Sequence, residues 1–106
     1  MAAQSYKTVE REAEIEFTVN RSRFIGYCFP VQTEAAALEH LEAIRRKHWD
    51  ATHNCYAYAV GERAETARYS DDGEPGGTAG MPMFEVLRQR ELTNLLVVAT
   101  DRKSVV

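Results

Sequence analysis

Residues 71–82 read Asp-Asp-Gly-Glu-Pro-Gly-Gly-Thr-Ala-Gly-Met-Pro, and this stretch decides how the rest of the chain divides into elements. Its first ten residues hold four glycines and one proline, too many for the interior of a helix or strand. We therefore interpret this part as a loop. Pro82 fits the first turn of a helix that presents Phe84, Val86 and Leu87 inward and ends with two arginines.

Strand patterns lie on both sides of this loop. Before it, residues 54–60 alternate between small and large side chains, which predicts a strand with one closely packed face. Residues 68–70 predict a further short strand. After the loop and its helix, the apolar residues 95–99 predict a buried strand.

The first half of the chain predicts a hairpin followed by a helix. Residues 13–19 alternate apolar and polar side chains, and residues 23–29 are apolar or aromatic almost throughout until Pro30. Thr33 can cap the next helix, whose C-terminal end carries the basic residues 45–47. Its predicted apolar stripe consists of Ala35, Leu38, Leu41 and Ile44.

This order of elements predicts an α/β fold of the α+β two-layer sandwich type, with a mixed sheet and the helices on one face. A length of 106 residues fits one small domain. We assign residues 1–12 to a flexible lead, residues 13–99 to the domain and residues 100–106 to a tail.

Composition excludes some classes of protein. A net charge of -3 argues against a protein that wraps nucleic acid by bulk attraction, although a local basic patch is compatible with it. With no leader pattern and no apolar run of about 18 residues, we expect a cytoplasmic protein that does not enter a membrane. In a reducing compartment Cys28 and Cys55 are expected to be free thiols.

The loop at residues 71–80 permits two opposite interpretations. Its glycines, at the start of a helix, can present backbone N–H groups to a phosphate, and a Mg²⁺ ion would reconcile that anion with Asp71, Asp72 and Glu74. Alternatively, Asp71 and Asp72 accept backbone N–H groups, and the loop is held by its own hydrogen bonds.

Three residues at the end of the first helix form a second candidate. His48, Asp50 and His53 can converge on a metal ion or act as an acid and base pair, or they can simply organise a helix C-terminus and turn. Cys55 with His53 as its base is the enzymatic alternative, against the ordinary interpretation of Cys55 as buried packing.

Aromatic residues suggest a third candidate. Tyr56 and Tyr58, with Arg23 and Arg68, can form a stacking and cationic surface for single-stranded RNA. The alternative is that both tyrosines pack in the core.

Two blocks of the sequence resemble the signature of the IMPACT/YigZ family. They are residues 48–58 (His-Trp-Asp-Ala-Thr-His-Asn-Cys-Tyr-Ala-Tyr) and residues 71–82, quoted above. The stretch Ser22-Arg23-Phe24-Ile25 is similar to the first residues of a strand in the same family. The resemblance runs from about Lys7 to Ala99. It implies a fold like domain 2 of ribosomal protein S5 and a role in translation control. After Ala99 the chain departs from the family pattern, so we expect the C-terminal end of the domain to be incomplete.

These observations favour a binding domain over an enzyme. The expected partner is the ribosome, RNA or a translation-associated protein, and no resident cofactor is expected unless the loop holds Mg²⁺. The alternative is a small metal-dependent hydrolase or a phosphate-binding enzyme that uses residues 71–80. The candidate binding residues are His48, Asp50, His53, Asn54, Tyr56, Asp71, Asp72, Glu74, Gly76, Gly77, Thr78 and Gly80.

Overall fold

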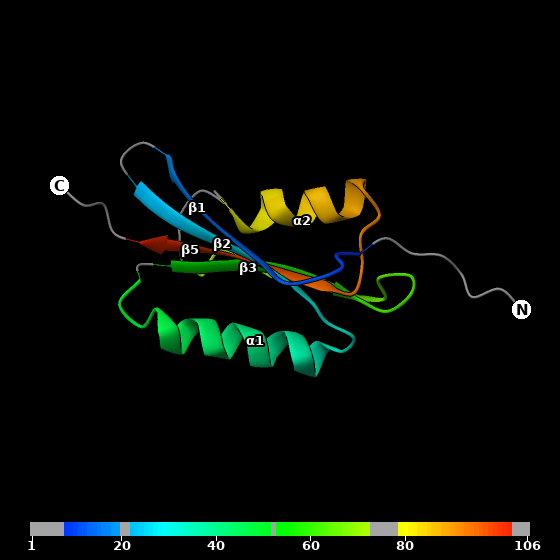
Figure 1. Cartoon of the computed structure of the whole chain (residues 1–106). Helices are drawn as coiled ribbons and strands as arrows, with labels where there is room; N and C mark the ends of the chain where they lie inside the picture. Colours follow the sequence, from blue (N-terminus) through cyan, green and yellow to red (C-terminus); the bar gives the residue numbers. More distant parts are fainter. Residues whose placement is uncertain (1–7, 20–21, 52, 73–78, 103–106) are drawn as a thin grey trace, which may run out of the picture.

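The structure is a computed structural model that describes residues 8–19, 22–51, 53–72 and 79–102. It contains one five-stranded sheet and two helices (Figure 1). In chain order the elements are β1 (Ala13–Val19), β2 (Ser22–Pro30), α1 (Glu34–Lys47), β3 (His53–Val60), β4 (Thr66–Ser70), α2 (Gly80–Gln89) and β5 (Leu95–Arg102). The predicted α/β class is confirmed.

The sheet has the strand order β1-β2-β5-β3-β4, and every pairing in it is antiparallel. The predicted hairpin of β1 and β2 is confirmed, whereas the prediction of a mixed sheet is wrong. β2 and β3 do run parallel to one another, because α1 crosses over between them. β5 then fills the gap between these two strands and runs against both, so no parallel pair forms.

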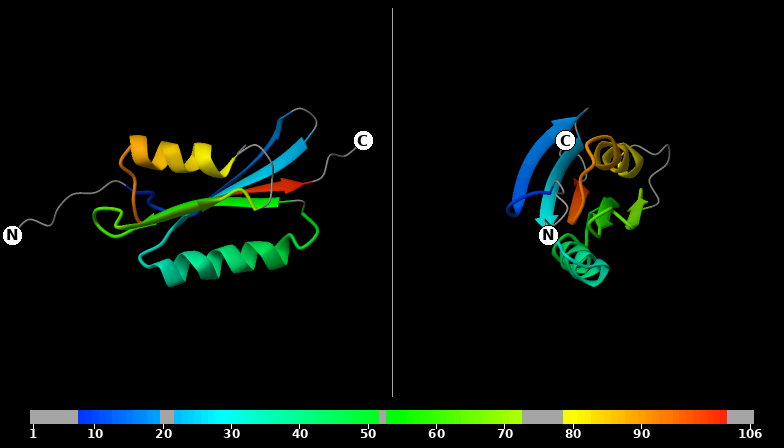
Figure 2. Two further views of the ribbon diagram at one scale, coloured as in Figure 1. Left: turned by 180° about the vertical axis from the view of Figure 1, so that it is seen from behind. Right: turned by 90° about the vertical axis from the view of Figure 1, so that its right-hand side faces the viewer.

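The two helices cover opposite faces of the sheet, which corrects the expectation of a two-layer sandwich with helices on one face (Figure 2). The reason lies in β3, which is apolar on both sides. Tyr58 and Val60 join the core beneath α1, while Ala57 and Ala59 lie under α2 with Leu87. A strand with two apolar faces requires cover on both.

Helix α1 begins as predicted, and the predicted stripe is right at Leu41 and Ile44 but wrong at Ala35 and Leu38. The Thr33 hydroxyl accepts the N–H of Ala36 at 3.0 Å, as an N-cap does. The buried residues are Ala37, Leu41 and Ile44, spaced by four and three, whereas Leu38 is 46% exposed. The predicted stripe began at Ala35, which is also exposed, so it was rotated from the true one.

Helix α2 buries Leu87, as predicted, and half-buries Phe84, whose ring lies 5.0 Å from that of Tyr69. The inward position predicted for Val86 is wrong, because this side chain is 47% exposed.

At both ends, residues outside the predicted bounds of the domain are part of its structure. The Thr8 hydroxyl donates to the carbonyl of Asn94 at 2.9 Å, and Val9 packs beside α2. At the other end, β5 continues through Thr100 to Arg102, beyond its predicted end at Ala99. Residues 1–7 of the predicted lead and residues 103–106 of the predicted tail lie outside the described residues.

Neither α1 nor α2 is long and apolar enough to span a lipid bilayer, and they are the helices of the described part of the chain.

Candidate functional site

The acidic start of the loop is joined directly to the first residues of β3. The Asp72 carboxylate accepts the backbone N–H of Asn54 at 2.8 Å, and the Asp72 carbonyl lies 2.9 Å from Nδ1 of His53. A carbonyl only accepts, so Nδ1 of His53 carries the proton. The two sequence blocks therefore meet at one end of the sheet.

The neighbouring carboxylate of Asp71 caps helix α2. Its Oδ1 accepts the N–H of Gly80 at 2.7 Å, and Ala79, the N-cap residue, offers no side-chain acceptor. This carboxylate occupies the position at the helix N-terminus where an anion would gain most from the N–H groups and the helix dipole. The interpretation of Asp71 and Asp72 as acceptors of backbone N–H groups is confirmed.

Gly80 is required at this junction for steric reasons. A Cβ atom at this position would lie 2.5 Å from the carbonyl oxygen of Ser70 and 2.9 Å from Oδ1 of Asp71. The chain therefore needs glycine here to bring the start of α2 against the end of β4.

His48 lies at the C-cap of α1 and is buried, with its ring held by two neighbours. Nδ1 lies 3.3 Å from the Arg102 guanidinium, and Nε2 lies 2.6 Å from the Tyr27 hydroxyl. Since arginine only donates, Nδ1 accepts and Nε2–H donates to Tyr27. Burial lowers the pKa of His48, and the positive charges of Arg102 and Lys47 lower it further.

Of the two interpretations of His48, Asp50 and His53, their convergence on one metal ion or as an acid and base pair is wrong. Asp50 pairs with Arg102 at 2.9 Å on the side of the sheet that faces α1, whereas His53 is bound to Asp72 at the start of β3. Across the described residues, no three His, Cys, Asp or Glu side chains are grouped so that they could hold a metal ion. In this region the residues organise a helix end and a turn.

The thiol of Cys55 is 1% exposed and donates to the Asp71 carbonyl at 3.4 Å. Since it is enclosed, a substrate cannot reach it, and this favours the interpretation of Cys55 as buried packing over that of a nucleophile. Cys28 and Cys55 are both free thiols, as predicted, and burial raises the pKa of Cys28.

The tyrosines of β3 lie under α1 rather than on an open surface. Tyr58 is 3% exposed and donates to the Glu34 carboxylate at 2.5 Å, which together with burial raises its pKa. Tyr56 is half-buried, stacks on Tyr58 and lies beneath the guanidinium of Arg45, 6.0 Å from the ring centre. Of the two interpretations, the core interpretation is therefore right for Tyr58, and a stacking surface that uses both tyrosines is wrong.

Four candidate residues of the loop, Glu74, Gly76, Gly77 and Thr78, lie outside the described residues. The binding of Mg²⁺ or an anion by this part of the loop stays a prediction.

The sequence interpretation missed one residue at this end of the molecule. Trp49, in the turn after α1, is 83% exposed, although tryptophan is usually well buried in a folded protein. Its position inside the block His48 to Tyr58 was the available signal.

We call the end surface the set His48, Trp49, Asp50, His53, Asp72 and Arg102. Two groups of contacts lie side by side here: Asp72 binds His53, and Arg102 binds Asp50 and His48, the two sequence neighbours of Trp49. The groups are adjacent because His53 on β3 pairs in register with Asp101, the residue before Arg102 on β5. In Figure 1 this surface lies at the end of the sheet where β3 begins and β5 ends.

Residues 20–101 match the Impact N-terminal domain. The chain is 47% identical over 96 residues to the IMPACT family member YvyE of Bacillus subtilis, which covers 91% of the chain and 44% of that protein. It is 39% identical over 71 residues to the IMPACT family member YigZ of Escherichia coli, covering 65% of the chain and 35% of that protein.

A solved structure described as that of a hypothetical protein matches with a TM-score of 0.80 and 27% identity, over 92% of the chain and 48% of the solved chain. The chain thus spans less than half the length of these relatives. Because the Impact N-terminal domain matches most of its residues, this chain belongs to the IMPACT family and carries the family's N-terminal domain.

Proposed function

We propose that this chain is a binding domain of translation control whose end surface contacts a protein of the translation machinery, either on the ribosome or associated with it. The role in translation follows from the family resemblance. The place of contact follows from Trp49, whose 83% exposure is the observation that carries the proposal.

An exposed tryptophan is costly in water and valuable at an interface, because it brings a large apolar area on a stiff side chain. Here the turn that carries it is fixed on both sides. His48 is bound to Tyr27 and Arg102, and Asp50 is bound to Arg102. Trp49 is therefore presented by a preorganised turn, which reduces the entropy lost on binding.

The same contacts favour binding over catalysis. Three described side chains that could act as a base or a nucleophile instead stabilise the fold. Asp71 caps α2, Asp72 binds the backbone of β3, and the thiol of Cys55 is buried. A catalytic carboxylate or thiolate needs access to a substrate and a partner that activates it.

Charge favours a protein partner over RNA. The end surface offers the carboxylates of Asp50 and Asp72, and its cation, Arg102, is already paired with Asp50. Phosphate recognition needs a surplus of positive charge, which neither this surface nor the net charge of -3 supplies.

The test is binding of the purified chain to ribosomes and to a panel of purified translation factors, at about 50 mM and about 200 mM salt. Trp49 is the only tryptophan in the sequence, so its fluorescence reports contact with any partner that itself lacks tryptophan. We expect Trp49→Ala to weaken binding at least tenfold with an unchanged unfolding midpoint.

Leu38→Ala is the matched control, since Leu38 is an exposed apolar residue of α1 and should leave binding unchanged. Absence of binding at low salt would remove the proposal. If an isolated component that contains RNA binds the chain, it is treated with ribonuclease. Loss of binding after this treatment would assign the contact to RNA and contradict a protein partner.

A further inference from the structure

Strand β1 is an edge strand, and no other described strand pairs with its outer side. Ile15, at its centre, is 64% exposed. An edge of this length presents a row of unpaired N–H and C=O groups to any segment able to add as another strand. The position is at the opposite edge of the sheet from β4 and uses none of the residues of the end surface.

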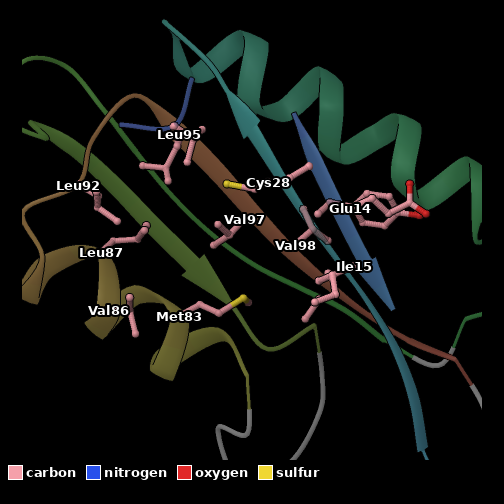
Figure 3. A pocket seen from close by; sticks show the side chains of 15 residues that line it. Glu14, Ile15, Cys28, Met83, Val86, Leu87, Leu92, Leu95, Val97 and Val98 are labelled. Carbon is pink, nitrogen blue, oxygen red and sulfur yellow. The ribbon is translucent and has the colours of Figure 1, made fainter. Parts of the chain in front are cut away.

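One face of β1 borders an apolar hollow of about 580 Å³ between the hairpin and α2. Figure 3 shows Ile15 directed toward this hollow, opposite Met83 and Val86 of α2. Cys28 and Val97 form its floor and Leu87 lies on its α2 side. An apolar side chain placed beside Ile15 would extend this surface and cover it from water.

The other face of β1 is acidic. Glu12 and Glu14 line a second hollow, of about 420 Å³, together with Tyr27, His40 and Lys47. Glu16, on the same face, is paired with Arg23, whereas neither Glu12 nor Glu14 forms an ion pair with another residue in the described part of the chain. β1 thus alternates apolar and acidic side chains with a period of two.

This alternation argues against a second copy as the added strand. In an antiparallel pair, residues that lie opposite share a face. If two copies of β1 matched apolar with apolar, their glutamates would face each other, and like charges directly opposite are destabilising. If they were shifted by one residue, each glutamate would lie beside an exposed apolar side chain of the partner.

We propose that β1 is a docking edge for an extended segment of a partner protein that alternates lysine or arginine with apolar residues. Its main chain would pair with the outer side of β1, its apolar side chains would lie beside Ile15, and its cations would meet Glu12 and Glu14. Main-chain hydrogen bonds provide affinity and alternate side chains provide specificity in strand addition. Charge pairing makes the contact weaken with salt.

The probe is a capped seven-residue peptide, Lys-Val-Lys-Val-Lys-Val-Lys, titrated into the full chain. Two control peptides are used. Four lysines followed by three valines keep the composition but lose the alternation, and the alternating peptide with glutamate in place of lysine keeps the alternation but reverses the sign of the charge. We expect the alternating basic peptide to bind at least tenfold more tightly than either control. Binding of either control peptide as tightly as the alternating basic peptide would overturn the proposal.

Variants locate the contact. Glu14→Lys and Ile15→Asp should each weaken binding at least tenfold, while Glu39→Lys, which makes the same charge change on the exposed side of α1, should leave it unchanged. Trp49→Ala should also leave it unchanged, so this proposal and the proposed function fail independently. Equal loss in Glu14→Lys and Glu39→Lys would reduce the effect to net charge and refute a specific edge.

Amide hydrogen exchange tests strand addition itself. In a free edge strand, alternate N–H groups point toward β2 and are already protected, while the others point outward. Peptide binding should slow exchange at every second residue of β1. Uniform protection, or none, would show that the peptide does not add to the sheet and would overturn the proposal.

Discussion

The Asp72 carboxylate accepts the backbone N–H of Asn54 at 2.8 Å, across 18 positions of the sequence. Asp72 also has a positive φ of 50°, a conformation that asparagine and aspartate tolerate better than other residues with a Cβ. One side chain therefore fixes both the backbone of the loop start and its attachment to β3.

Asp72→Ala removes this acceptor and keeps the unfavourable φ, so we expect it to destabilise the chain by about 2 kcal/mol. Asp72→Asn keeps an acceptor and suits the same φ, so it should cost less than half as much. Urea unfolding followed by circular dichroism measures both. Equal losses would mean that the hydrogen bond to Asn54 contributes nothing beyond the charge of Asp72.

Gly80→Ala tests the junction between β4 and α2. The added Cβ would lie 2.5 Å from the Ser70 carbonyl oxygen, which belongs to the backbone and cannot turn away. We expect a loss of about 1–3 kcal/mol in the free energy of unfolding, the range for forcing atoms into a packed site. Met81→Ala, at an exposed neighbouring position, is the control and should change stability by less than about 0.5 kcal/mol.

The pKa of His48 makes stability depend on pH. It is lowered in the folded chain, chiefly by burial, so the unfolded chain binds the proton more readily. Stability from this group is complete above the unfolded value of about 6.5 and declines as pH falls from there through the folded pKa. Protonation would also place a donor on Nδ1 against Arg102, which only donates.

Unfolding in urea at several pH values between about 8 and 5 measures this effect. The groups that face His48 are Tyr27, Lys47, Asp50, Glu14 and Arg102. His48→Gln keeps a donor and an acceptor but does not titrate, so its stability should fall less over the same range. Identical profiles for the two proteins would rule His48 out as the source.

Helix α1 offers a matched pair of leucines. Leu41 is 2% exposed in the core under the sheet, while Leu38, in the preceding turn, is 46% exposed. Leu41→Ala should cost about 2–5 kcal/mol through lost burial and the cavity left behind, and Leu38→Ala less than about 1 kcal/mol. Thermal unfolding of both variants distinguishes the observed stripe from the predicted one, in which the two leucines were equivalent.

Local patterns predicted the elements well. β1 has the bounds that the alternation in residues 13–19 indicates, and Thr33 caps α1. The errors arose where the answer depended on distant residues. Nothing near α1 distinguishes a stripe through Leu38 from one through Ala37, because that choice depends on how the helix lies over β3 and β5.

The predictions about the candidate site were also partly right and partly wrong. The meeting of Asp72 with His53 followed from two sequence blocks that form one surface, and the structure brings them together. The separation of His48 and Asp50 from His53 depends on Arg102, which was assigned to a tail and gave no local signal. Sequence spacing alone does not reveal which face of a sheet a turn residue reaches.

The last strand offers a test of a side-chain contact between β5 and β3 at Thr100, which lies beyond the predicted end of the domain. Its side chain is 0% exposed, and its hydroxyl donates to the Asn54 side chain at 2.8 Å, with the carboxamide itself buried. Thr100→Val keeps the shape but leaves the Asn54 oxygen without this donor, so we expect a loss of about 1–3 kcal/mol. Thr100→Ser keeps the hydroxyl and loses one methyl group, about 1 kcal/mol. If unfolding in urea shows Thr100→Val to be no less stable than the native chain, the hydrogen bond from Thr100 to Asn54 contributes nothing to the stability of the contact between β5 and β3.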